Sequence, residues 1–321
     1  MNITKDFLKH CSRLYNNNHK FNDDTIIKIG IGKECSNVSV TPYNKQDRIS
    51  NSSSKNSNNI NYNQFKTLKN IKEITHRYQN KIIGTFEIDD IFITLTQMDQ
   101  KIKINNDIKI INNFTEKVTN VIQAGFNRVL KKHNVKVNSL LNVIDFHKNG
   151  VLHFHTLIKF DNNIFNNNVL TIGHNINEDI LDKLKKYFKR YKLNCKIKRI
   201  YNVNGLANYL GRKQNNVDKY IDYAYSFKHI PINMKLYRIK GKVENKKEYY
   251  IEYGVLKNIL NFLFEKTNIN ETFSKQYFIK DIDGNILYRV SRFTLEFDRQ
   301  YYDLINNTLK QYDIRYLDNV A

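Results

Sequence analysis

The feature that most constrains this fold is a hairpin signal between residues 142 and 160. Two runs of β-branched and aromatic residues flank Lys148-Asn149-Gly150, a triplet typical of a tight turn between antiparallel strands. Successive side chains of a strand point to opposite faces, so His153 and His155 lie on one face of the second strand. The sequence therefore predicts an antiparallel pair of strands that carries two imidazoles side by side.

The length of the turn decides which residues stand opposite the histidines. A three-residue loop with Gly150 in the left-handed conformation pairs Asp145 with His153 and places His155 opposite Val143. A two-residue loop instead puts Asp145 on the other face, because a slip of one residue inverts every side chain. We favour the three-residue loop, since it gathers five apolar side chains on the second face: Ile144, Phe146, Leu152, Phe154 and Ile158. One carboxylate and two imidazoles then converge, which is the outline of a metal site.

Composition favours a polyanionic partner, because the 321 residues carry a formal net charge of +21. The chain is rich in Asn, Lys and Ile, as drift in an AT-rich genome produces, and this accounts for part of the lysine excess. Its cysteines, Cys11, Cys35 and Cys195, share no close spacing, which argues against a disulfide framework and for a reducing compartment. No apolar run reaches the length of a membrane span. We expect a cytoplasmic protein with no membrane partner.

The remaining pattern predicts an α+β fold, a central antiparallel sheet with helices packed on one side. Strands are expected at residues 25–31, 81–87, 91–96 and 194–200. Helices are expected at 4–15, at 114–133 with Asn113 as N-cap, at 178–190, from about Asn204, and at 256–265. A second hairpin is expected at 276–297, turning at Asp283-Gly284.

Three regions follow from these elements. Residues 1–79 form an N-terminal extension with a disordered Ser/Asn-rich linker near 46–64, since that stretch holds too little apolar surface to order itself. Residues 80–234 form the domain that carries the candidate chemistry. Residues 235–321 form an α+β extension whose role the sequence does not indicate.

Three segments, in this order, resemble the motifs of the HUH rolling-circle replication initiators, the Rep endonucleases of small plasmids and single-stranded DNA phages. Residues 92–96, an apolar strand ending in Leu-Thr, are similar to the first motif. The segment from Asp145 to His155 resembles the second, although the family usually has Glu at the acidic position. Residues 207–213 resemble the third motif, Tyr-Leu-x-Lys on a helix, and either Arg212 or Lys213 fills the place of the family lysine.

The resemblance implies a nicking-joining enzyme built on a HUH sheet of ferredoxin-like descent. Tyr209 would attack the scissile phosphate of single-stranded DNA at a replication origin and form a 5′-phosphotyrosine link. The free 3′-OH would serve the host DNA polymerase, with a host helicase as a further partner. An Asp-His-His set with open positions suits Mg²⁺ or Mn²⁺ better than structural zinc. A phenol pKa near 10 requires a neighbouring cation, which Arg212 or Lys213 would supply.

The sequence leaves other assignments open. Tyr220 is the alternative nucleophile, and Thr94, Thr96, Lys186 and Arg190 are the expected DNA contacts. A non-catalytic nucleic-acid-binding protein derived from a Rep is a second functional class. A relaxase or transposase uses the same chemistry, but a relaxase normally places its tyrosine before the histidines, and single-domain transposases of this type are much shorter.

Overall fold

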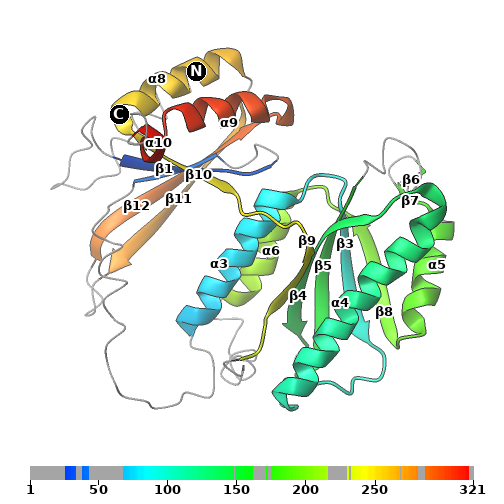
Figure 1. Cartoon of the computed structure of the whole chain (residues 1–321). Helices are drawn as coiled ribbons and strands as arrows, with labels where there is room; N and C mark the ends of the chain where they lie inside the picture. Colours follow the sequence, from blue (N-terminus) through cyan, green and yellow to red (C-terminus); the bar gives the residue numbers. More distant parts are fainter. Residues whose placement is uncertain are drawn as a thin grey trace. The chain divides into compact units, whose positions relative to one another are not determined.

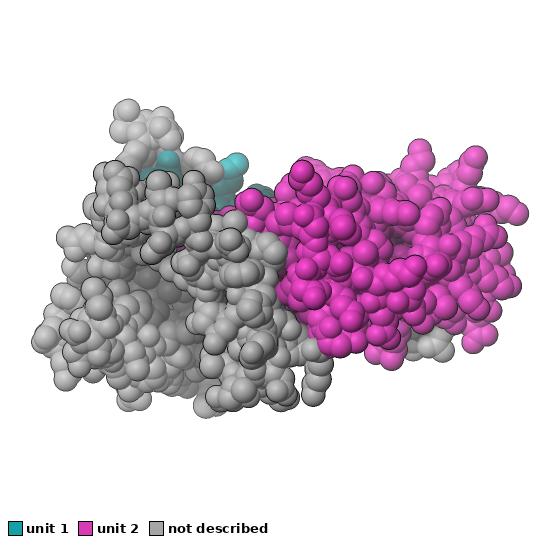
Figure 2. Space-filling view, turned by 90° about the horizontal axis from the view of Figure 1, so that it is seen from below, with its two compact units in different colours: residues 1–60, 246–321 teal, residues 61–245 magenta. Residues whose placement is uncertain are grey.

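A computed structural model describes ten segments of the chain: residues 26–33, 38–42, 68–147, 149–161, 171–172, 175–215, 230, 233–267, 269–280 and 286–317. The expected helix at 4–15, the linker at 46–64 and the turn at Asp283-Gly284 lie outside them. The chain divides into two compact units, residues 1–60 with 246–321 (unit 1) and residues 61–245 (unit 2) (Figure 2). These bounds differ from the expected regions because strands distant in sequence pair with one another, as described below.

Unit 2 is built on an antiparallel sheet in the order β8-β3-β5-β4-β9 (Figure 1). Its strands are β3 (Ile91–Gln97), β4 (Val137–Phe146), β5 (Leu152–Phe160), β8 (Leu193–Arg199) and β9 (Tyr237–Gly241), with a separate two-residue pair β6 (Thr171–Ile172) and β7 (Asn175–Ile176). The α+β class and the antiparallel sheet are confirmed. Strand β9 pairs with β4, so the segment just after residue 234 belongs to this sheet.

Helices cover both faces of this sheet, whereas the sequence analysis expected them on one. The helices are α3 (Leu68–Thr85), α4 (Ile108–Leu130), the short η2 (Lys131–His133), α5 (Glu178–Lys189) and α6 (Val203–Asn215). Apolar side chains of α4 and α5 pack on one face of the sheet, which we call the closed face. Those of α3 and α6 pack on the other face, which we call the site face. Figure 1 shows the two pairs of helices on either side of the strands.

The closed face carries the apolar set that the favoured hairpin register predicted. Ile144, Phe146, Leu152, Phe154 and Ile158 all lie in its core. Helix α4 buries Val118, Ile122 and Phe126 against them. Its start was misplaced in the sequence analysis: Asp107, not Asn113, is the N-cap, and its carboxylate accepts a hydrogen bond from the Lys109 backbone N–H at 2.7 Å. The apolar spacing in fact begins with Ile108 and Ile111, which pack on the same core.

Helix α3 corrects a second expectation, since residues 81–85 belong to it and not to a strand. The run Lys81-Ile82-Ile83 has the β-branched character of a strand, which misled the local prediction. Tyr78, Ile82 and Phe86 recur every four residues and are fully buried on the site face. Tertiary packing therefore overrides the local preference.

Unit 1 is a second five-stranded sheet in the order β10-β1-β2-β12-β11. Its elements are β1 (Ile26–Ile31), β2 (Val38–Pro42), β10 (Lys247–Glu252), α8 (Tyr253–Lys266), β11 (Ile269–Lys280), β12 (Ile286–Phe297), η3 (Arg299–Tyr301), α9 (Tyr302–Gln311) and α10 (Ile314–Leu317). Strand β1 pairs with β10 and β2 pairs with β12, so the first strands of the chain complete a sheet with its last ones. Ile27, Ile29 and Ile31 pack with α8 and α9 in its core. Within the described residues, every helix is too short or too polar to cross a bilayer.

Candidate metal centre

The hairpin between β4 and β5 has the three-residue register. Asp145 pairs with His153 and Val143 with His155. The His147 backbone N–H donates to the Val151 carbonyl at 2.9 Å, and Gly150 has a φ of +79°, the left-handed conformation that glycine adopts most readily. The two-residue alternative is excluded, and the three candidate ligands share the site face.

The three side chains meet at their tips. The Nε2 atoms of His153 and His155 lie 3.2 Å apart, and each lies 3.3 Å from Oδ2 of Asp145. All three residues are buried, with exposed fractions of 8% for Asp145, 5% for His153 and 4% for His155. The result is a nearly equilateral triangle of potential ligand atoms, shielded from bulk water.

The size of this triangle matches a metal ion. Three ligand atoms about 2.1 Å from one ion stand about 3.0 Å apart in octahedral geometry and about 3.4 Å apart in tetrahedral geometry. The observed separations of 3.2 to 3.3 Å fall between these values. A carboxylate also balances part of the charge of a divalent cation in this buried setting. The Asp-His-His group can therefore bind a metal ion, as the sequence predicted.

Neighbouring groups hold two of the ligands in place. Oδ1 of Asp145 accepts the Phe146 backbone N–H at 2.8 Å, which turns Oδ2 toward the imidazoles. Nδ1 of His155 lies 3.3 Å from the Thr94 hydroxyl, and the Phe92 ring stacks on the imidazole with ring centres 5.6 Å apart. A proton on Nδ1, donated to Thr94, leaves the Nε2 lone pair for a metal. Thr94 is therefore placed to accept a hydrogen bond in the tautomer that metal binding requires.

Tyr209 lies next to this group. Its ring centre is 6.1 Å from that of His155 at an interplanar angle of 78°, and 47% of the residue is exposed. It is carried by α6, whose Val203, Ala207 and Leu210 are buried in the core of the site face. A solvent-accessible phenol thus lies beside a buried ligand set, 54 residues later in the chain than His155.

Close packing of α3 against α6 positions this tyrosine. The Tyr78 hydroxyl donates to the Leu210 carbonyl, and the Gln79 amide donates to the Ala207 carbonyl, both at 3.0 Å. A Cβ added to Gly211 would lie 1.9 Å from the Gln79 amide nitrogen, so a larger residue there would displace the end of the Gln79 side chain. The glycine within the Tyr-Leu-Gly segment thus leaves room for the hydrogen bond from Gln79 to Ala207.

The other predicted site residues are distributed as follows. Thr94 and Thr96 stand directly opposite His155 and His153 on β3, and so lie on the site face. Lys186 and Arg190 are exposed at α5, which packs on the closed face, and they are not brought to the triad. Tyr220 and the side chains of Arg212 and Lys213 lie outside the described part of the chain.

A basic strand edge that was not predicted from the sequence lies beside the site. Strand β8 pairs with β3 so that Lys196 stands opposite Thr94 and Lys198 opposite Phe92. Both lysines are exposed, and neither forms an ion pair with another described residue. The alternation of Lys with Cys195 and Ile197 was visible in the sequence, but only the pairing of β8 with β3 places these charges on the site face.

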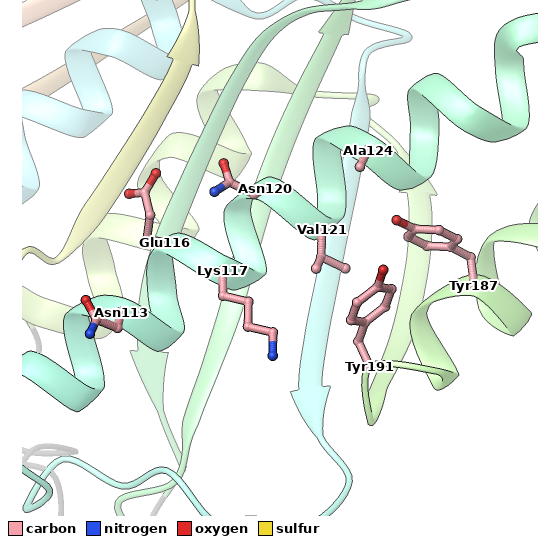
Figure 3. A pocket seen from close by; sticks show the side chains of 8 residues that line it. All are labelled: Asn113, Glu116, Lys117, Asn120, Val121, Ala124, Tyr187 and Tyr191. Atoms are coloured by element: carbon pink, nitrogen blue, oxygen red, sulfur yellow. The ribbon is translucent and has the colours of Figure 1, made fainter.

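A cavity of about 490 Å³ lies on the closed side, between α4 and α5 (Figure 3). Two of its titratable groups, Glu116 and Tyr187, interact with neighbouring side chains. The pKa of Glu116 is lowered by a hydrogen bond from Lys240, and the pKa of Tyr187 is raised by burial and by its hydrogen bond with Tyr191. Cys195 lies at the edge of the apolar core of the closed face, and burial raises the pKa of its thiol to about 11. Among the described residues, the group that could hold a metal ion lies on the site face and not in this cavity.

Comparisons with known proteins leave the chain without a family. No family model matches it, and no curated protein matches it. Among solved structures it is similar to the crystal structure of an unknown protein from Galdieria sulphuraria, with 8% sequence identity and a TM-score of 0.17 over 72% of this chain and 94% of that chain. A likeness this weak carries no argument, so the function has to be judged from the chemistry of the site.

Proposed function

We propose that this chain is a metal-dependent endonuclease of single-stranded DNA, which cuts and rejoins a strand by transesterification onto Tyr209. The observation that carries the proposal is the juxtaposition of a buried Asp-His-His group with an accessible phenol, its ring centre 6.1 Å from that of His155. The resemblance of the three ordered motifs to HUH Rep endonucleases supports the same chemistry. It also supports initiation of rolling-circle replication as the biological role.

Asp145, His153 and His155 would hold the ion, and Mg²⁺ or Mn²⁺ suits a set that includes a carboxylate and leaves positions open. When bound, the metal supplies a Lewis acid for the phosphate oxygens. Thr94 would accept a hydrogen bond from Nδ1 of His155 and so leave the Nε2 lone pair to the ion. The exposed Lys196 and Lys198 add positive charge along the edge of the same face, where a DNA backbone would run.

The covalent step exchanges one phosphate ester for another. The Tyr209 oxygen forms a bond to phosphorus as the bond between phosphorus and the 3′-oxygen breaks. The phenol proton passes to solvent, which reaches the half-exposed side chain, and the leaving 3′-oxygen takes a proton from solvent. The products are a 5′-phosphotyrosine and a free 3′-OH, and attack by that hydroxyl reverses the reaction. A host polymerase could extend the same 3′-OH.

The test uses the full chain, Mn²⁺ and a pool of single-stranded oligonucleotides of random sequence. We expect a protein–DNA adduct that survives denaturing electrophoresis, is lost in EDTA, and maps by mass spectrometry to the peptide containing Tyr209. Tyr209→Phe should abolish it, whereas Tyr201→Phe, at a neighbouring tyrosine that is 65% exposed, should not. Asp145→Asn should abolish the adduct and reduce Mn²⁺ binding.

Two outcomes would contradict this proposal. An undiminished adduct in Tyr209→Phe would remove Tyr209 as the nucleophile and direct attention to Tyr220. Salt-sensitive DNA binding without any adduct would support the non-catalytic nucleic-acid-binding protein instead.

A further inference from the structure

A pocket of about 510 Å³ lies at the hairpin end of the site face, lined by Thr96, Gln100, His147 and Asn149. It borders the candidate metal centre on the side of His153. Thr96 stands directly opposite His153 across β3 and β5. The rings of His147 and His153 stack with centres 4.3 Å apart and an interplanar angle of 28°.

Tyr209 approaches the centre from the other side. Its helix packs with Leu141, Val143 and Leu157, and Val143 is the residue opposite His155. Helix α6 thus covers the site face as far as His155. The next residues of that face toward the turn are Asp145, His153 and Thr96, which stand side by side on three neighbouring strands. Along the site face the order is Tyr209, His155, His153 and then the pocket.

Displacement at phosphorus proceeds with the attacking and leaving oxygens roughly in line. A phenol that enters from the side of α6 therefore expels the 3′-oxygen toward the hairpin end. We infer that the pocket lined by Thr96, Gln100, His147 and Asn149 binds the nucleotide on the 5′ side of the cut, whose 3′-oxygen leaves. This inference rests on the proposed function and adds to it the location of a base-selecting pocket.

The lining suits a nucleobase. Bases of single strands are held by stacking on aromatic rings, including that of histidine, and by hydrogen bonds from amide side chains to their edges. The Asn149 amide donates to Oε1 of Gln100 at 3.2 Å and thereby fixes the Gln100 amide. Within the described residues, the Gln100 amide nitrogen and the Thr96 hydroxyl have no hydrogen-bond partner. Both groups remain available to a base edge.

If this pocket binds a base, the cleaved strands should show a base preference on the 5′ side of the cut, and sequencing of the products measures that preference. The random oligonucleotide pool is cut by the full chain with Mn²⁺. The last nucleotide of each released strand reports the 5′ side of the cut, and the first nucleotide attached to the protein reports the 3′ side. We expect wild type to show a base preference of about tenfold or more at the 5′ position, the discrimination that one or two base hydrogen bonds supply.

Gln100→Met keeps the length of the side chain and removes its hydrogen bonds. It should reduce the preference at the 5′ position to within about threefold of random and leave that at the 3′ position unchanged, because one base hydrogen bond has been lost. Thr96→Val is a second variant of nearly unchanged shape. Gln123→Met, on α4 at the closed face, is the matched control and should leave both positions unchanged.

The inference is overturned if adducts form without any 5′ preference in wild type. It is equally overturned if the 5′ preference survives in both Gln100→Met and Thr96→Val. In those cases adduct formation at Tyr209 leaves the proposed function standing. If no oligonucleotide forms an adduct, the proposed function fails and the pocket assignment fails with it.

Discussion

The two faces of the sheet in unit 2 differ although they are built from the same strands. The closed face is mostly apolar and is covered by α4 and α5, and its buried polar pair, Asn142 and Thr156, is joined by a hydrogen bond of 2.8 Å. The site face is apolar only where α3 and α6 cover it, and its hairpin end carries the Asp-His-His group. His153 and His155 lie on the site face, and Phe154 between them lies in the core of the closed face.

The difference shows how one strand serves stability and chemistry at once. Period-two alternation sends Phe154 into a core that stabilises the sheet, and the same backbone fixes both imidazoles at a set distance. Helix α6 packs on the site face only as far as His155, so the Tyr209 side chain is half exposed. Rigid strands that α3 and α6 cover only in part thus give a buried candidate ligand set and a phenol that solvent can reach.

The sharpest test of the closed face is Phe154→Ala. We expect the free energy of unfolding of unit 2 to fall by about 3–5 kcal/mol, because the side chain is fully buried and leaves a cavity. Urea unfolding followed by far-UV circular dichroism measures this. Tyr209→Ala, at an aromatic residue of the site face that is 47% exposed, is the matched control and should change stability by no more than about 1 kcal/mol. Equal effects of the two would break the contrast between the faces.

The second test concerns the group behind the ligands on the site face. Thr94→Val should lower the affinity for Mn²⁺ by about 10-fold to 100-fold, because the hydroxyl that orients His155 is lost. Isothermal titration calorimetry measures the affinity. Thr96→Val changes the next threonine on the same face and should leave metal affinity within about twofold. A loss of equal size in both variants would show that Thr94 does not act through His155.

The third test asks which face the DNA follows. Lys196→Gln with Lys198→Gln should reduce the slope of log affinity against log salt by about 1.4, since each phosphate contact to a single strand contributes about 0.7. Lys186→Gln with Arg190→Gln removes two charges at α5, beside the closed face, and should leave the slope unchanged. Fluorescence anisotropy of a labelled oligonucleotide gives both slopes. A larger effect of the second pair would favour the contacts that the sequence analysis expected and place the strand over α5.

The smallest expected effect is at Glu116 on the closed side. The pKa of this carboxyl is lowered by the hydrogen bond from Lys240 and by the positive charges of Lys240, Arg238 and Lys235. Its contribution to stability is therefore present above pH 4.5, the ordinary value, and is lost as the pH falls through the lowered pKa of the folded state. Glu116→Gln should cost about 0.2–1 kcal/mol at pH 7, as expected for a partly exposed pair, and nothing at low pH. Urea midpoints at both pH values measure the difference, and a penalty that persists at low pH would contradict an electrostatic origin.

The local sequence predicted the structure correctly where the interacting residues are close together in the chain. The turn chemistry of Gly150 and the alternation of both strands fixed the register that brings Asp145 to His153 and His155. It was insufficient for residues 81–85, whose β-branched run is compatible with strand or helix until α6 packs against it. Lys196 and Lys198 were equally beyond local prediction. They belong to an ordinary alternating strand pattern, and only the pairing of β8 with β3 places them on the site face.

The sequence by itself determined the α+β class, the hairpin and the three ligands, because neighbouring strands joined by a short turn have few ways to pair. Only the tertiary structure decided that Tyr209 lies beside those candidate ligands and that His147 and Thr96 line one pocket at the hairpin end. It also decided that the first strands of the chain complete the sheet of the last ones. These arrangements join segments tens to hundreds of residues apart, and their free energy comes from burying apolar faces against one another, which no local pattern records.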